Sequence, residues 1–272
     1  MLRTLPFNRL SMGIQTFNES ILKVLQRRHT ARQAIEAFQN CRAAGFQNIS
    51  IDLMYGLPGE TLSTWQQDLD QALLLHPEHL SAYHLIYEED TVLWKLREQH
   101  KVEEADEDLS VSLFSTLIDQ LTSEGYDHYE ISNFSLPGLY SRHNSSYWTE
   151  KKYLGCGPSA HSYNGVSRQW NVASLDTYIK GISAGTPVFE IEELDLYTRY
   201  NDFVITRIRT EWGMPLSKLR DEFGEKLYDY CLRMAAPHLK QGTLELVNDI
   251  LKLTRKGIFI SDGIMSDMLW TD

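Results

Sequence analysis

The stretch that most constrains the fold is residues 48–61, with the sequence NISIDLMYGLPGET. It starts as an apolar run and ends in a Gly-Leu-Pro-Gly turn, after which Thr61 is placed to cap a helix that carries Leu62, Trp65, Leu69 and Leu73. This pattern predicts a buried strand leading into a crossover helix. Asp52 is exceptional, because an acid in such a run must be paired or must face a cavity where α/β folds place ligands. We interpret it as a ligand contact, with a structural salt bridge as the alternative.

Strands and helices alternate along the first half of the chain. A strand over residues 9–15 precedes a helix capped by Asn18, Thr30 is a second possible cap, and further strands are predicted over 79–87 and 126–131. Such alternation implies parallel strands joined by right-handed crossovers down to about residue 135. About four strands are too few to close a barrel. We therefore expect a barrel or open α/β sheet whose front part is missing.

The second half of the chain has a different texture. Long aromatic and glycine-rich connections run from residue 133 to about residue 162, and such connections carry function when a scaffold holds them. From residue 175 the pattern is mostly helical, with helices predicted over 197–210, 216–223 and 226–241 and a hairpin over 242–253. We expect a domain over residues 1–165 and a small winged-helix-like domain over 166–272.

Charge and cysteine usage exclude several classes of protein. The 272 residues carry a formal net charge of −11, whereas nucleic-acid binding needs a positive surface, so we expect no nucleic-acid partner. Cys41, Cys156 and Cys231 are too far apart to match a zinc or iron-sulfur spacing and are interpreted as reduced core thiols. The N-terminus does not resemble a signal peptide and no apolar run approaches membrane length. The expected compartment is the cytoplasm.

Five motifs in a fixed order carry a family resemblance over nearly the whole chain. They are RLSMGIQTF (9–17), SIDLMYGLPGET (50–61), SAYHLIYEEDT (81–91), HNSSYW (143–148) and GCGPSAHS (155–162). Together they resemble radical SAM proteins related to the oxygen-independent coproporphyrinogen III oxidase HemN, and HNxxYW is similar to the element of the heme-chaperone branch, HemW. The resemblance implies an α/β fold in which a partial radical SAM (β/α)6 TIM-like barrel is followed by a small, mainly helical, winged-helix-like domain.

The resemblance also assigns cofactor positions in the barrel. It implies that Gln15, Arg27 and Asp52 line the S-adenosylmethionine site, with Ile86 and His161 as backbone neighbours. The chemistry is compatible, because Asp52 and Gln15 offer acceptors for ribose hydroxyls or the ammonium group, and Arg27 offers a fork for the carboxylate. The alternative for Arg27 is a surface residue after a helix.

One defining feature of the family is absent from this sequence. The family motif CxxxCxxC binds a [4Fe-4S] cluster through thiolates, and this spacing does not occur among the three cysteines. The resemblance therefore implies a chain without the N-terminal cluster-binding part, which we expect to be unable to cleave S-adenosylmethionine by itself. No residue is assigned as catalytic.

The HNSSYW stretch is predicted to be a second site. Imidazole is a common axial ligand of heme, and neighbouring aromatic rings can pack on a porphyrin face. The resemblance implies that His143 ligates heme iron, with Asn144, Tyr147 and Trp148 beside it. The alternative is that His143 and Asn144 only tie a loop to the barrel rim while Trp148 packs in the core.

Three functional hypotheses remain open at this point. The first is a HemW-type heme chaperone, whose full-length relatives bind [4Fe-4S], S-adenosylmethionine and heme and deliver heme to an accepting protein. The second is an oxygen-independent coproporphyrinogen III oxidase, an oxidoreductase of porphyrin biosynthesis that carries out oxidative decarboxylation. The third is a non-catalytic partner-binding module, because an incomplete barrel exposes strand edges that favour pairing, for instance in a homodimer.

Overall fold

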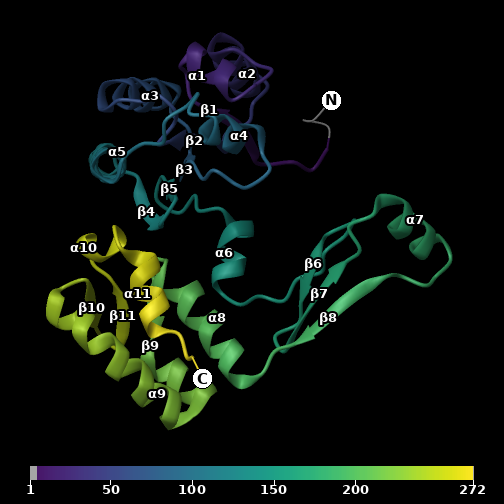
Figure 1. Ribbon diagram of the computed structural model, residues 1–272, viewed down its shortest axis with the longest axis vertical. Coiled ribbons are helices and arrows are strands. Elements are labelled where there is room, and N and C mark those ends of the chain that lie inside the picture. The colour runs from purple at the N-terminus through teal and green to yellow at the C-terminus, as the bar shows by residue number, and fades with distance from the viewer. Residues whose placement is uncertain (1–4, 272) are drawn as a thin grey trace. The chain divides into compact units, whose positions relative to one another are not determined.

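The computed structural model describes residues 5–271. The chain folds into two compact units (Figure 1), of which the first ends at Ser141 and the second starts at Arg142. The domain boundary predicted after residue 165 falls within the second of these units. The two units are described separately.

The first unit is built on one five-stranded sheet with the strand order β1-β2-β3-β5-β4. Its described elements are β1 (Leu10–Gln15), α1 (Glu19–Val24), α2 (Ala31–Ala43), β2 (Ile49–Tyr55), α3 (Leu62–Leu75), β3 (His79–His84), α4 (Val92–Glu98), α5 (Glu107–Ser123), β4 (Asp127–Glu130) and β5 (Asn133–Ser135). The strands β1, β2 and β3 are parallel, as the sequence predicts. Within the described residues the sheet is open, with β1 and β4 at its edges.

The parallel order ends at β5, and here the sequence prediction was wrong. The strand β5 is antiparallel to both of its neighbours, β3 and β4. Only Ile131 and Ser132 separate β4 from β5. A connection of that length can form a hairpin but not the helical crossover that a parallel pair requires.

The helix starts in this unit are specified locally. Asn18 accepts hydrogen bonds from the backbone of α1, and Thr30 and Thr61 form capping boxes with the third residue of α2 and α3. All three caps are confirmed.

The two faces of β2 differ in polarity. Tyr55 contacts Trp65 of α3 and Phe114 of α5, with ring centroids 5.6 and 5.9 Å apart, so the face it shares with Ile51 and Leu53 is the apolar one. Asp52 lies on the opposite face. By alternation and strand register, Met54 and Tyr83 follow on the same face, whereas the neighbours of Asp52 toward the strand starts are polar or small: Ser11, Gly13, Ser50, His79 and Ser81.

The second unit contains two small sheets and six helices among its described residues. Its elements are α6 (Arg142–Trp148), β6 (His161–Tyr163), β7 (Ser167–Asn171), α7 (Leu175–Ser183), β8 (Phe189–Glu193), α8 (Leu196–Ile208), β9 (Met214–Pro215), α9 (Leu216–Gln241), β10 (Leu244–Val247), β11 (Ile250–Leu253), α10 (Arg255–Ile258) and α11 (Ser261–Met268). The predicted helices and the hairpin β10–β11 are confirmed. The second and third predicted helices form the single α9, which bends at Gly224, where φ is 79°.

The sheet β6-β7-β8 was not predicted from sequence. With α7 it forms an arm, residues 161–193, which Figure 1 shows beside the helices α8 to α11 of the same unit. Every residue of β8 is exposed. A strand without a buried face has no apolar run by which it can be recognised.

Gly257 tests the packing of the second unit. A Cβ at this position in α10 would lie 1.9 Å from the carbonyl oxygen of Thr243, so we expect Gly257→Ala to lower the free energy of unfolding by about 3 kcal/mol. Gly263 in α11 is the matched control, because a Cβ there meets no atom within 4 Å and Ala should gain about 0.5–1 kcal/mol. Urea denaturation measures both changes. Equal stability of the two variants would contradict the close approach.

Candidate functional site

Gln15, Arg27 and Asp52, for which the family resemblance implies one site, lie around Gly13 in β1. Gly13 is the register partner of Asp52 on β2. The strand register shifts between Gly13 and Gln15, and Gln15 has φ 72°, a bulge geometry that re-aims a side chain. A Cβ on Gly13 would lie 2.7 Å from Gln15 Nε2 and 3.5 Å from Arg27 Nη2. Arg27 Nη2 also donates to the Gly13 carbonyl at 3.3 Å. The missing side chain at Gly13 leaves room for the Gln15 and Arg27 side chains over the strand position that adjoins Asp52.

The Asp52 carboxylate is held by hydroxyl groups. Ser11 Oγ donates to it at 3.4 Å, and Asp52 makes no ion pair within residues 5–271. Burial raises the pKa of Asp52, while hydrogen bonds from Ser81 and Ser11 and the charge of Arg9 oppose this rise. The structural salt bridge, which was the alternative interpretation of Asp52, is therefore not found among these residues. A half-buried carboxylate with weak partners retains acceptor capacity for a ligand.

A buried hydrogen-bond chain continues along the same face of the sheet. Ser50 Oγ lies 2.8 Å from Nδ1 of His79, and Nε2 of His79 lies 2.6 Å from the Tyr129 hydroxyl. Burial lowers the pKa of His79 to about 3, so this imidazole is neutral near pH 7. The sequence analysis did not predict these hydrogen bonds, although the alternation of Ser50 and Asp52 with apolar residues in β2 indicates a polar face.

Two buried carboxylates fix the turns that follow β1 and β2. Glu60 Oε2 accepts the N–H groups of Gly56 at 2.7 Å and Leu57 at 3.2 Å, whereas its Oε1 is buried without a hydrogen-bond partner. Burial raises the pKa of Glu60 to about 7, and nearby Asp68 adds to the rise. Asp68 Oδ1 accepts the N–H of Phe17 at 2.8 Å. Both carboxylates hold backbone at the carboxyl end of the sheet.

In the second unit, the predicted heme residues lie on α6. His143 and Tyr147 are both exposed and one helical turn apart, and the Tyr147 hydroxyl lies 3.1 Å from His143 Nε2. Their rings are edge to face, with centroids 5.1 Å apart. Asn144 and Trp148 are half-buried, and the Arg209 guanidinium lies 4.3 Å from the Trp148 ring centroid. Trp148 is therefore half-buried beneath Arg209 and is not part of the fully buried core.

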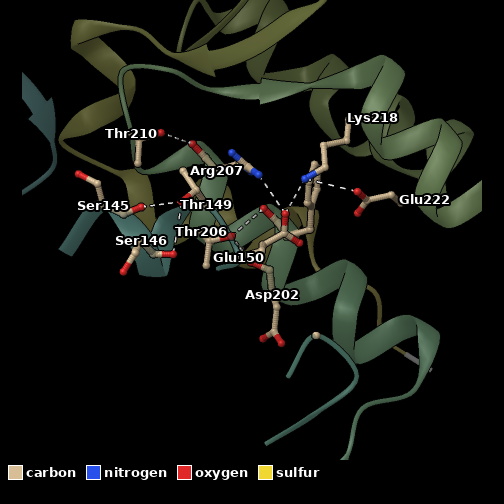
Figure 2. Close-up of polar contacts among 12 residues, drawn as sticks. Ser145, Ser146, Thr149, Glu150, Asp202, Thr206, Arg207, Thr210, Lys218 and Glu222 are labelled. Atoms are coloured by element: carbon tan, nitrogen blue, oxygen red, sulfur yellow. Dashed lines mark hydrogen bonds and ion pairs between the residues drawn. The ribbon is translucent and has the colours of Figure 1, made fainter. Parts of the chain in front are cut away.

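Glu150 ties the end of α6 to two other helices of the same unit. Its Oε2 accepts from Arg207 Nη2 of α8 at 2.9 Å and from Lys218 Nζ of α9 at 2.8 Å, as Figure 2 shows. Glu150 itself has φ 57°, and Thr149 Oγ1 donates to the Ser145 carbonyl at 3.0 Å. These contacts fix the orientation of α6 within its unit. Sequence reasoning did not single out Glu150, because its partners are more than 50 residues away in the chain.

Ile86 and His161 are the remaining predicted residues. Ile86 follows β3, and its side chain is 75% exposed. His161 begins β6, so it belongs to the second unit, where its ring stacks on Trp170 with centroids 5.9 Å apart.

The cysteines do not fit an iron-sulfur cluster. Cys231 on α9 is buried, which raises the pKa of its thiol to about 11, but Cys41 is half-buried and Cys156 is exposed. The prediction that all three are core thiols is therefore confirmed for Cys231 alone. Among residues 5–271 no three or more His, Cys, Asp and Glu side chains cluster so that they could hold a metal ion together. We therefore derive no step through a cluster.

Comparison with known proteins identifies the family. Residues 1–72 match the Radical SAM superfamily, and residues 194–260 match the HemN C-terminal domain. The chain is 31% identical to the heme chaperone HemW of Lactococcus lactis over 97% of this chain and 70% of that protein. The chain belongs to the HemW family of radical SAM proteins. HemW of Bacillus subtilis is 29% identical over 99% of this chain and 71% of that relative.

A solved structure confirms the fold predicted for this HemW family member. The coproporphyrinogen III oxidase HemN of Escherichia coli, a radical SAM enzyme, superposes with a TM-score of 0.80 at 22% identity. The match covers 98% of this chain and 65% of the HemN chain, so the chain spans about two thirds of the length of that protein. Within residues 5–271, none of the helices combines the length and the apolar character needed to cross a bilayer.

Glu60 is expected to make stability depend on pH. Its pKa of about 7 exceeds the ordinary value of 4.5, so the folded state binds this proton more tightly and stability falls as pH rises through this window. Relative to Glu60→Gln, the wild-type chain should lose on the order of 2 kcal/mol of unfolding free energy between about pH 5 and pH 8. Urea denaturation at both pH values measures this loss. The exposed Glu124→Gln variant should behave as wild type, and parallel pH profiles for wild type and Glu60→Gln would contradict the burial of this carboxylate.

Proposed function

We propose that this chain binds heme as the cargo of a HemW-type chaperone and that His143 on α6 ligates the iron. The observation that carries the proposal is the pairing of two exposed side chains, His143 and Tyr147, on one face of that helix. When Nε2–H donates to the tyrosine oxygen, Nδ1 keeps its lone pair for a metal. Imidazoles that bind metals commonly use their second nitrogen in this way.

The anchoring of α6 supports the same role. Glu150 holds the end of the helix to α8 and α9, and Trp148 is covered by Arg209. A ligating side chain on an element fixed by its neighbours is positioned more precisely than one on a free loop. The names of the HemW relatives, heme chaperones, agree with a cargo role.

Hemin titration tests the assignment of His143. We expect His143→Ala to abolish one saturable phase of the Soret absorbance change, because the iron loses its axial nitrogen. Tyr147→Phe keeps the ring but removes the hydroxyl, so it should weaken that phase by about 3–10-fold, the worth of a single hydrogen bond.

His100→Ala removes an exposed imidazole in the first unit and serves as the control for adventitious heme binding. Identical titrations of wild type and His143→Ala would refute the role of His143.

We also propose that Gln15, Arg27 and Asp52 contact S-adenosylmethionine in the first unit. The space over Gly13 into which Gln15 and Arg27 project is the support for this fit. The Asp52 carboxylate would accept from ribose hydroxyls or from the ammonium group, and a guanidinium matches a carboxylate. When bound, S-adenosylmethionine supplies a sulfonium centre, and these side chains bind and orient the molecule.

Gly13→Ala should weaken S-adenosylmethionine binding, measured by calorimetry, by at least about tenfold. Its Cβ would fall 2.7 Å from Gln15 Nε2, the far end of a flexible side chain, so Gln15 moves while the sheet stays folded. Asp52→Asn should weaken binding to a similar extent. Truncating the exposed Leu74 of α3 to Ala is the control and should leave affinity unchanged. Unaltered binding in both Gly13→Ala and Asp52→Asn would place the ligand elsewhere.

The proposal also covers the compartment, the protein partner and the oligomeric state. We propose a cytoplasmic location, transfer of heme to an accepting protein, and a homodimer formed through the barrel edge. Three free cysteines agree with a reducing compartment, and β1 is an edge strand of the first unit.

A further inference from the structure

The sheet of the arm has one outer edge that is paired and one that is not. Its strand order is β6-β7-β8, so β6 and β8 are the outer strands. Beside β6, Tyr153 forms a backbone bridge with Tyr163, in which each N–H donates to the carbonyl oxygen of the other at 3.0 and 2.9 Å. Among residues 5–271 no strand or bridge pairs with the outer side of β8, and all five residues of β8 are exposed.

The strand register shows which backbone groups the β8 edge presents. Five residue pairs join β7 to β8 without a shift. Next to these pairs, Leu194 N–H donates to the Val166 carbonyl at 2.9 Å, and Val172 N–H donates to the Val188 carbonyl at 3.1 Å. Because bonded and non-bonded pairs alternate along antiparallel strands, the even-numbered residues bond to β7. The odd-numbered residues therefore direct their N–H and C=O groups to the outer edge: Phe189, Ile191 and Glu193.

The side chains of β8 differ between the two faces of the arm. By alternation, Glu190 and Glu192 lie on one face, whereas Phe189, Ile191 and Glu193 lie on the other. Phe189 is 40% exposed and Ile191 is 54% exposed. A strand that pairs with this edge would therefore meet acids on one face and mainly apolar side chains on the other.

The acids of β8 are available to a partner. Glu190 and Glu193 make no ion pair within the described residues. Glu192 lies 3.7 Å from Arg168 Nη1, but the same guanidinium pairs more closely with Asp202. Three carboxylates beside an unpaired edge, on a chain with a formal net charge of −11, favour a positively charged partner.

We propose that β8 is a docking edge, to which a partner protein adds an extended segment as an antiparallel fourth strand of the arm. Directly opposed residues share a face, so the segment has a defined pattern. Opposite residues 189 to 193 it carries an apolar, a basic, an apolar and two basic side chains. Main-chain hydrogen bonds supply the affinity in this mode of recognition, and the side chains supply the selectivity. The inference depends neither on heme nor on S-adenosylmethionine.

A synthetic peptide tests the proposal on the full chain. In the antiparallel direction the pattern corresponds to the peptide TKKVKVT, whose binding is followed by the fluorescence anisotropy of an N-terminal dye. We expect saturable binding that weakens on the order of fivefold when salt rises from about 0.05 to about 0.5 M, because salt screens exposed charges. The acidic peptide TEEVEVT should not bind. Absence of saturable TKKVKVT binding up to about 1 mM would overturn the proposal.

N-methylation of the peptide tests the main-chain hydrogen bonds. In the proposed register the second, fourth and sixth residues of TKKVKVT direct their amide groups to β8, and the third and fifth direct theirs away. Methylating the first set should abolish binding. Methylating the third and fifth residues is the matched control and should preserve binding. If the peptide methylated on the side of β8 bound as well as the unmodified one, strand addition would be overturned.

Two kinds of variant test the edge from the side of the protein. Ile191→Pro removes an outward N–H and leaves the hydrogen bonds to β7 in place, so TKKVKVT binding should weaken by at least about tenfold. Ile191→Val keeps the N–H and should bind within about twofold of wild type. Circular dichroism verifies that both variants retain the fold.

Charge reversal tests the selectivity. The double variant Glu190→Lys/Glu193→Lys should lose TKKVKVT and gain binding of TEEVEVT, because opposite charges again face one another. Equal binding of both peptides by the wild-type chain would overturn the basic partner. Light scattering tests whether a second copy takes the edge. A doubled mass that Ile191→Pro returns to that of the monomer would assign the edge to self-association and would also overturn the proposal.

Discussion

The parallel pairing of β1 with β2 is the constraint on which the first unit depends. In this register Gly13 stands beside Asp52, so a residue without a side chain adjoins the single carboxylate of the strand. A shift by one residue would move every side chain of β1 to the other face. The polar face would then lose Gly13, and the space now occupied by Gln15 and Arg27 would be filled. The binding geometry is therefore a property of strand register as much as of residue type.

Carboxylates anchor the loops in both units, but by different means. Glu60 and Asp68 accept backbone N–H groups in the interior, where burial raises their pKa values. Glu150 instead receives two cationic side chains near the surface. The first arrangement holds the turns of a parallel sheet, and the second holds a short helix on two longer ones. In each case the carboxylate fixes a segment next to candidate binding residues, because Phe17 follows Gln15 and Glu150 follows α6.

Local signals explain which parts of the fold the sequence could predict. The strand, turn and helix around Asp52 were predictable because apolar period, turn residues and the cap at Thr61 all act within a few residues. The antiparallel β5 and the arm were not, because strand direction and a sheet of exposed strands leave little trace in hydrophobic pattern. The sequence indicated Asp52 as a candidate binding residue because it is an acid within an apolar run. Gly13 and Glu150 were not identified from the sequence, because their roles depend on partners that are distant in the chain.

The exposed strand β8 has a consequence for how the arm behaves in a crowded solution. It is one of the two outer strands of its sheet, and its sequence FEIEE places three acidic side chains among two apolar ones. If two copies approached along this edge, Glu190, Glu192 and Glu193 of each would face like charges. Charged residues on an edge strand oppose such pairing between identical chains. The arm can therefore leave a strand edge open to solvent without becoming a template for aggregation.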